Sequence, residues 1–117
     1  MNLSKTQRSR LDIAVKLAEL STCKQRHGAA VFSGGRLMSV GYNRSHVNNK
    51  WLDGHPLPHT THAEVDALQK LSDDVVKGAT IYIARIFKTG EEAMSAPCSS
   101  CRKYLIRRKV KSIVYTT

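Results

Sequence analysis

The chain has 117 residues, of which 41% are hydrophobic, and a formal net charge of +10 from 19 basic and 9 acidic residues. This size and composition predict one compact domain over residues 1–117, and they exclude a membrane span, since no apolar run approaches ~20 residues. The N-terminus lacks the continuous apolar stretch of a signal peptide, so we expect a cytoplasmic protein, and the positive charge favours a phosphate-bearing partner.

The first half of the chain is predicted as a helix, a β-hairpin and a long loop. Apolar residues recur at helical spacing from about residue 4 to 21. Residues 28–32 and 36–42 are predicted as two strands joined by a tight glycine-containing turn. Residues 43–61 hold two prolines, a glycine and many polar residues, which is typical of a long functional loop.

The second half continues the alternation of helices and strands. The predicted elements are a helix over residues 62–71, a strand over 79–87, a loop over 88–96, a helix over 98–109 and a strand over 110–117. Pro97 suits the entry to the last helix, because proline is favoured in a first helical turn. The whole order predicts an α/β sandwich in which helices pack on a mixed sheet.

The cysteine pattern points to a metal or to redox chemistry. Of the three cysteines, two form a C-x-x-C motif at Cys98 and Cys101. In a reducing compartment such a pair favours metal or redox chemistry over a structural disulfide. Cys23 stands alone and is interpreted as a buried or inert thiol.

Together with His62, this cysteine pair supplies the three protein ligands of a catalytic zinc site, whose fourth position is left to water. Cys98 and Cys101 share one face at the start of a predicted helix, and His62 begins another helix. If both helices lie on the same side of the sheet, their first turns converge. We therefore predict one zinc ion per chain.

Glu64 follows His62 by two residues and is predicted to carry protons rather than to bind the metal. Zinc lowers the pKa of bound water from ~15.7 to about 7, and a carboxylate nearby can then accept its proton. The resulting hydroxide would attack a ring carbon that bears an amino group, while Glu64 passes protons to the ring nitrogen and to departing ammonia. The pattern predicts hydrolytic deamination of an aminopyrimidine or aminopurine.

Each motif by itself has another interpretation. C-x-x-C also occurs in structural zinc sites and redox pairs, and an isolated H-x-E pattern is common. A structural zinc site would need a fourth ligand, for which His27, His46, His55 and His59 are available. The joint pattern, in which each half opens a predicted helix, favours the catalytic interpretation.

The segments "HAEVDAL" and "PCSSC" resemble the zinc-dependent cytidine and deoxycytidylate deaminase superfamily, which has an H-x-E and P-C-x-x-C signature. Residues 26–46 are similar to the first hairpin of that family, and the likeness covers about residues 9–117. It is strongest for the deoxycytidylate-type branch, which includes tRNA adenosine deaminases. The resemblance implies a three-layer α/β/α fold and the following roles: zinc ligands His62, Cys98 and Cys101, proton shuttle Glu64, base contact through the backbone of Ala63, and sugar or base contact through Asn43.

Several residues keep two interpretations. Asn43 either contacts substrate or caps a turn. Asp66 stands where many deoxycytidylate deaminases have Asn, and it either orients the His62 imidazole or is a solvated helix carboxylate. The chain ends where relatives usually continue, so the sheet is expected to be truncated after its fourth strand. Further candidates for contact with a nucleotide or its phosphate are Arg26, Arg44, Lys50, Trp51, His55 and His59.

The favoured function is zinc-dependent deamination of a cytosine nucleotide or nucleoside, with dCMP preferred as substrate, by an enzyme that forms a homo-oligomer. The first alternative is deamination of cytosine or adenine in a polynucleotide. In that case residues 102–111, with six basic and no acidic side chains, would follow the backbone rather than form a solvated helix face. The second alternative is a non-catalytic, zinc-stabilised module that binds nucleic acid.

Overall fold

The computed structural model describes residues 2–45, 51–52, 55–56 and 60–117. A mixed sheet forms its centre, in the order β2-β1-β7, with β8 and β9 both paired to β7. Its strands are β1 (Arg26–Ser33), β2 (Arg36–Tyr42), β7 (Thr80–Ile86), β8 (Glu92–Ala93) and β9 (Ser112–Tyr115). The pairs β1–β2, β1–β7 and β7–β8 are antiparallel, whereas β7–β9 is parallel.

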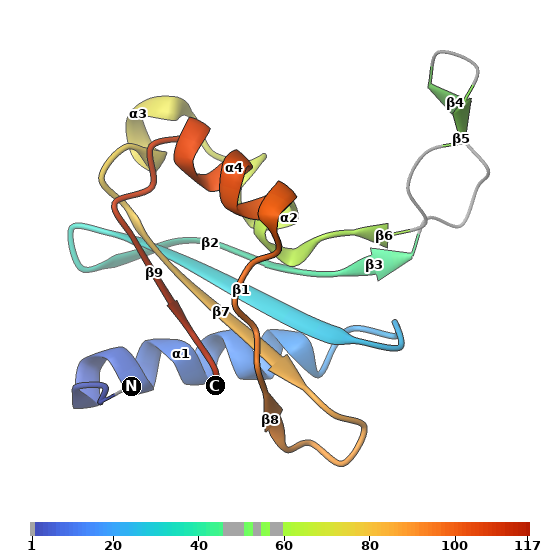
Figure 1. Cartoon of the computed structure of the whole chain (residues 1–117). Helices are drawn as coiled ribbons and strands as arrows, with labels where there is room; N and C mark the ends of the chain where they lie inside the picture. The colour runs from blue at the N-terminus through green and yellow to red at the C-terminus, as the bar shows by residue number, and fades with distance from the viewer. Residues whose placement is uncertain (1, 46–50, 53–54, 57–59) are drawn as a thin grey trace.

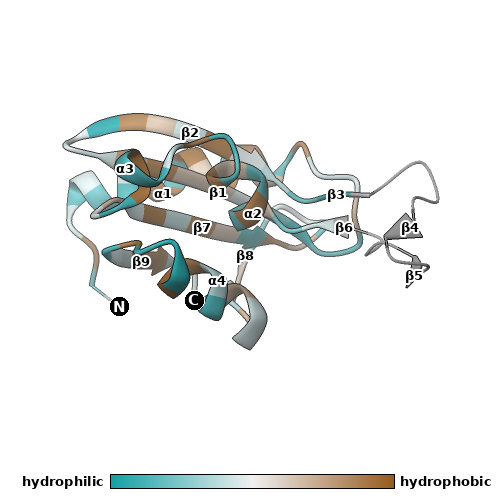
Figure 2. Cartoon of the chain, turned by 90° about the horizontal axis from the view of Figure 1, so that it is seen from above, coloured by the Kyte–Doolittle hydropathy of each residue, from teal (hydrophilic) through white to brown (hydrophobic). Residues whose placement is uncertain are grey.

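Helices cover both faces of this sheet. One face carries α1 (Lys5–Ala18), and the other carries α2 (Ala63–Leu68), α3 (Asp73–Val76) and α4 (Ser99–Arg107) (Figure 1). Two-residue strands also pair between β2 and α2, namely β3 (Arg44–Ser45) with β6 (Thr60–Thr61), and β4 (Trp51–Leu52) with β5 (His55–Pro56). Hydrophobic and hydrophilic residues alternate along α4, as expected for a helix with one face on the sheet (Figure 2).

Alternation along the strands divides the core into two layers. Successive residues of a strand point to opposite faces, so Ala30 and Phe32 of β1 pack toward α1, whereas Ala29 and Val31 pack toward α2 and α4. The layer under α1 contains Leu11, Ala14, Ala30, Phe32, Tyr82, Ala84 and Val114. The opposite layer contains Ala29, Val31, Ala63, Ala67, Leu68, Val76, Ala79, Ile81, Ile83 and Leu105. The predicted three-layer α/β/α sandwich is confirmed.

The predicted elements agree with the structure in type, and the differences lie in short segments. Within the described residues, the sheet has four strands of four or more residues and ends with β9, as expected, but the predicted loop 88–96 contains β8. The one-turn helix α3 was not predicted, since four residues are too few to show a helical period. Parts of the predicted loop 43–61 form two-residue ladders, and residues 46–50, 53–54 and 57–59 lie outside the described residues.

None of the helices in the described part of the chain has the length and apolar character that crossing a membrane requires.

The contact between α1 and β1 depends on Gly28. A Cβ atom at this position would lie 2.0 Å from the Ala14 carbonyl oxygen and 2.5 Å from the Ala18 amide nitrogen. Both neighbours are backbone atoms of α1, so they cannot move aside unless the helix shifts. The absence of a side chain at Gly28 therefore sets how closely the first layer approaches the sheet.

We expect Gly28→Ala to lower the free energy of unfolding by about 1–3 kcal/mol, because the added methyl group overpacks the contact with α1. Urea unfolding measures the difference. Leu37→Ala is the control, since Leu37 is 46% exposed on β2 and its loss should cost about 0.5 kcal/mol or less. An unchanged midpoint of urea unfolding for Gly28→Ala would mean that α1 and β1 are not tightly packed at this position.

Candidate active site

Three potential metal ligands come together at the starts of α2 and α4. His62 is the N-cap of α2, Cys98 is the N-cap of α4, and Cys101 lies in the first turn of α4. Their ligand atoms all lie within 4.8 Å of one another, and His62 Nδ1 is 3.0 Å from Cys101 Sγ. Ligand atoms around one tetrahedral zinc ion are about 3.5–3.8 Å apart, given its usual bond lengths. One imidazole and two thiols in this arrangement therefore fit a zinc site.

Glu64 lies beside this cluster. It belongs to the first turn of α2 and is only 5% exposed. Burial raises the pKa of the Cys101 thiol above its ordinary value, and the negative charge of Glu64 and hydrogen bonds to Glu64 and Cys98 raise it further. A metal ion that binds Cys101 must therefore displace a proton, as is usual for thiolate ligands.

The cluster opens into a pocket of about 640 Å³. This volume is within the usual range of small-ligand sites, roughly 300–1,000 Å³. The lining residues come from the start of β1, the end of β2, the first turn of α2, the end of β7 and the segment that leads into α4. They are residues 23–25, 27, 43, 62–64, 85, 94–98 and 101.

Asn43 holds neighbouring segments together and also lines the pocket, so its substrate contact stays a prediction. Its side chain is 7% exposed, donates from Nδ2 to the Gln25 carbonyl oxygen at 2.6 Å, and accepts at Oδ1 from the His27 amide at 2.8 Å. These bonds fasten the end of β2 to the start of β1. A side-chain amide has two donors and two acceptor positions, so one of each is left for the pocket that Asn43 lines.

Ala63, the other predicted substrate contact, is also buried in the pocket wall as the first residue of α2. Its amide belongs to the first turn, where backbone N–H groups have no acceptor within the helix.

Asp66 has a role that neither interpretation from the sequence anticipated. It is 1% exposed, so it is not a solvated carboxylate. It forms an ion pair with Arg44 and accepts a hydrogen bond from the Tyr42 amide at 3.2 Å, with Lys70 Nζ at 3.8 Å. Among the described residues, the carboxylate thus holds the end of β2 rather than orienting His62.

The remaining candidates are distributed as follows. Arg44 is paired with Asp66, and Arg26 does not line the pocket. His27 lines the pocket but is outside the three-residue metal cluster, which is the one such cluster within the described chain. Lys50, His46 and His59 lie outside the described residues, and only the backbone is described at Trp51 and His55.

The sequence analysis missed the pocket residues at the end of β7 and after β8. Arg85 at the end of β7 and Met94, Ser95 and Ala96 before Pro97 all line the pocket. Arg85 interrupts the otherwise apolar run "ATIYIARIF", and this interruption was the available signal. The segment 94–96 carries no comparable signal, because its position depends on contacts with the end of the chain.

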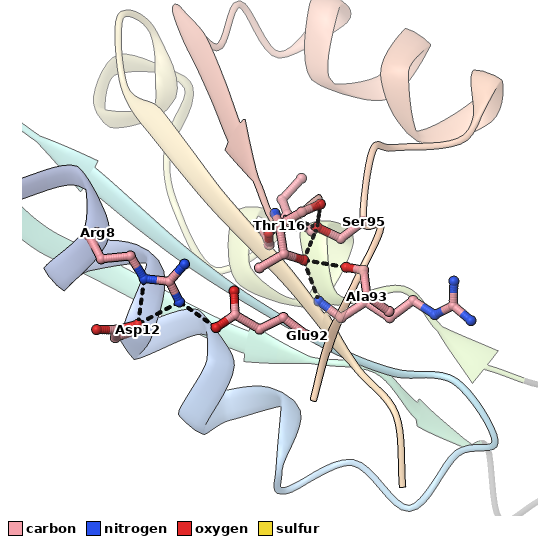
Figure 3. A network of polar contacts seen from close by, with 8 residues as sticks. Arg8, Asp12, Glu92, Ala93, Ser95 and Thr116 are labelled. Carbon is pink, nitrogen blue, oxygen red and sulfur yellow. Dashed lines mark hydrogen bonds and ion pairs between the residues drawn. The ribbon is translucent and has the colours of Figure 1, made fainter. Parts of the chain in front are cut away.

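A buried polar network holds that segment in place (Figure 3). Thr116 Oγ1 donates to the Ala93 carbonyl oxygen at 2.6 Å, and the Thr116 amide is 2.9 Å from Ser95 Oγ. Ser95 Oγ also donates to the Ile83 carbonyl oxygen at 2.8 Å. Ser95 and Thr116 are 3% and 2% exposed, so these bonds are shielded from water. The network fixes the chain two residues before Pro97 and thereby the start of α4.

Comparison with known proteins identifies the family. The model of the cytidine and deoxycytidylate deaminase zinc-binding region matches residues 4–117. The chain belongs to this family. As a member, it is a zinc-dependent aminohydrolase by class, which confirms the prediction from the sequence. No curated protein sequence matches the chain.

Several solved structures share the fold. The dCMP deaminase of the cyanophage S-TIM5 superposes in its apo form with a TM-score of 0.74 at 22% identity, covering 97% of this chain and 84% of that chain. Its complex with dCMP and dUMP gives 0.73 at 23% identity, covering 98% and 83%. Form 2 of Acinetobacter baumannii RibD gives 0.64 at 23% identity, covering 95% of this chain and 28% of that chain. At these identities the likeness establishes the fold.

We expect Asp66→Asn to lower the free energy of unfolding by about 1.5–3 kcal/mol, because Arg44 loses a buried, charged hydrogen-bond acceptor. Urea unfolding measures the change. Asp12→Asn is the matched control: Asp12 also pairs with an arginine, Arg8, but its side chain is 54% exposed, so the cost should stay below about 1 kcal/mol. Equal effects of the two substitutions would contradict the assigned role of Asp66.

Proposed function

We propose that the chain catalyses zinc-dependent hydrolytic deamination of a cytosine nucleotide, with a dCMP-like substrate preferred. The observation that carries the proposal is the combination of three convergent metal ligands with a buried carboxylate, Glu64, on the same pocket. A purely structural zinc site needs no such carboxylate, and a proton-transfer step does. The shared fold with a dCMP deaminase solved in complex with dCMP and dUMP supports the choice of substrate.

His62, Cys98 and Cys101 would hold one zinc ion per chain. When bound, zinc lowers the pKa of its water to about 7, which supplies a nucleophile at neutral pH.

The reaction replaces an amino group with a carbonyl group. A C–O bond forms at C4 of the cytosine ring and the C4–N bond breaks, so that cytosine and water give uracil and ammonia. Glu64 accepts a proton from the attacking water and delivers protons to the ring nitrogen N3 and the leaving amine. Its burial keeps competing water away from the carboxylate, and its place on a helix fixes its direction.

Two further residues would position the substrate. The unused donor and acceptor of Asn43 suit a sugar hydroxyl or a base edge, and the Ala63 amide suits a polar atom of the base. Both are rigidly held, Asn43 by the backbone at Gln25 and His27 and Ala63 by its place in α2. Rigid placement of the substrate contributes directly to rate.

The alternative of a polynucleotide substrate depends on the exposed basic residues of α4. Arg102, Lys103 and Arg107 are exposed on this helix. Arg108, by contrast, turns inward, where it donates to the Leu68 carbonyl oxygen at 3.1 Å and pairs with Asp73. The basic run 102–111 is thus partly structural, which weakens its use as a continuous backbone track. Affinity for an oligonucleotide that follows this face would fall steeply with added salt.

We further propose that residues 1–117 form one deaminase domain that self-associates in the cytoplasm. The family model matches residues 4–117, which supports a single domain. The C-x-x-C pair suits a metal site in a reducing compartment, which supports a cytoplasmic location. Self-association is supported by large apolar side chains on the surface, including Met38 of β2 and Ile106 of α4, at 38% and 67% exposure.

We expect Glu64→Gln to reduce ammonia release from dCMP by at least about 100-fold, because the amide cannot accept and return the proton. Zinc content and melting temperature should be retained, and both are measured on the same sample. Glu19→Gln is the matched control, an exposed glutamate at the end of α1 on the opposite face of the sheet. Normal turnover by Glu64→Gln would remove Glu64 from the reaction.

We expect Cys98→Ser to lose zinc on dialysis, whereas wild type should hold about one zinc ion per chain. Mass spectrometry of the metal content measures both. The control is Cys23→Ser, because Cys23 lines the same pocket but lies outside the three-residue cluster. Full zinc occupancy in Cys98→Ser, or equal loss in Cys23→Ser, would contradict the ligand assignment.

A further inference from the structure

The floor of the pocket contains a pair of polar residues from neighbouring strands. His27 of β1 lies directly opposite Arg85 of β7. The next pairs on the same face are Ala29 with Ile83 and Val31 with Ile81, which belong to the apolar layer under α2 and α4. Because side chains on one face of a sheet recur at every second residue, His27 and Arg85 continue that row beyond the apolar layer. This places both beneath the pocket that they line.

Arg85 forms no ion pair within the described residues. Its Nε is buried and has no hydrogen-bond partner among them. Its guanidinium makes one long hydrogen bond, from Nη1 to the Met94 carbonyl oxygen at 3.4 Å, and lies 5.7 Å from the centre of the Phe87 ring. The Nε atoms of Arg26 and Arg108 are also buried without a hydrogen-bond partner, but neither residue lines the pocket, and Arg108 forms an ion pair with Asp73.

This arrangement leaves Arg85 ready for an anionic ligand. A buried donor without an acceptor is costly, and a ligand oxygen that accepts from it recovers that cost. The planar guanidinium offers donors in a fixed fork that matches phosphate oxygens. Its backbone is anchored, since the Arg85 amide donates to Thr116 Oγ1 at 3.2 Å. The side chain therefore projects from a fixed point.

The other charges on the pocket support the same conclusion. Burial lowers the pKa of His27 below its ordinary value; the Glu64 carboxylate acts in the opposite direction, and Arg85 lowers the pKa further. These effects disfavour the charged imidazole, so the positive charge on this side of the pocket belongs mainly to Arg85. Lys24, which is exposed and also lines the pocket, adds a second positive charge just before β1.

We propose that Arg85, assisted by Lys24, binds the phosphate of a mononucleotide substrate and selects phosphorylated over unphosphorylated cytosine compounds. The inference rests on the proposed function, since it assigns a substrate class to the same pocket. A mononucleotide is favoured over a polynucleotide because Arg85 lines a small-ligand pocket and is not one of the exposed basic residues of α4. The competing role for Arg85 is an internal counter-charge to Glu64 and the thiols, although no ion pair joins Arg85 to Glu64 within the described residues.

Steady-state kinetics of the zinc-loaded full chain separate these roles. For Arg85→Gln, the ratio of kcat/KM for dCMP to kcat/KM for deoxycytidine should fall roughly 10- to 100-fold, mainly through a higher KM for dCMP. Lys24→Gln should lower the same ratio by less. An unchanged ratio, with both substrates impaired equally, would overturn the proposal in favour of the counter-charge.

Arg10→Gln is the matched control. Arg10 has the same intermediate exposure and also stacks on a phenylalanine, Phe32, at 4.6 Å, but it belongs to α1 on the opposite face of the sheet. The substrate ratio should not change in this variant. A fall equal to that of Arg85→Gln would show that the loss reflects net charge rather than the pocket, and would overturn the proposal.

Binding of the reaction product tests the phosphate site without turnover. Calorimetry should give tighter binding of dUMP than of deoxyuridine to wild type, and Arg85→Gln should remove most of the difference. If wild type releases no ammonia from any cytosine compound but shows this binding pattern, the proposed reaction fails and the phosphate site stands. Equal binding of dUMP and deoxyuridine by wild type, or Arg85-dependent preference for a single-stranded oligonucleotide over dCMP, would overturn the mononucleotide assignment.

Discussion

The convergence of two helix starts on one face of the sheet is the constraint on which the candidate site depends. His62 and the two cysteines are far apart in the chain, and they meet because α2 and α4 both begin at the same end of the sheet. On the α2 side, β2 passes so close that a Cβ atom at Gly41 would lie 2.6 Å from the Ala67 amide. On the α4 side, the buried hydroxyls of Ser95 and Thr116 hold the segment before Pro97.

The pocket concentrates polar groups that the rest of the core avoids. Glu64 and the Cys101 thiol are buried beside each other, and Arg85 holds a buried nitrogen without a partner among the described residues. Such arrangements cost stability and occur where a ligand or a metal later supplies the missing partner. The apolar layers on the two faces of the sheet offset this cost. Successive residues of β1 and β7 point to opposite faces, and those in the middle of both strands are buried.

Family membership and local geometry answer different questions about this enzyme. The family establishes the class of chemistry, and the likeness to the cyanophage dCMP deaminase establishes the fold. The metal cluster and Glu64 are assigned to the chemistry, so discrimination between substrates falls to the other residues that line the pocket. The antiparallel pairing of β7 with β8, in which Arg85 lies opposite Ala93, brings Arg85 and Met94 to the pocket, and Thr116 braces this pairing through bonds to both strands. We therefore expect substrate specificity to depend on the pocket wall rather than on the metal cluster.

From the amino-acid sequence alone followed the order of helices and strands, the three layers, and His62, Glu64, Cys98 and Cys101 as candidates for the site, because residue type and short-range spacing were enough to name them. Asn43 was identified as well, but its bonds to Gln25 and His27 became visible only in the folded chain. The roles of Asp66, Arg85 and Thr116 were decided by tertiary structure. Their partners lie on other strands and helices at large sequence separations, and no local pattern encodes which of them a side chain will meet after folding.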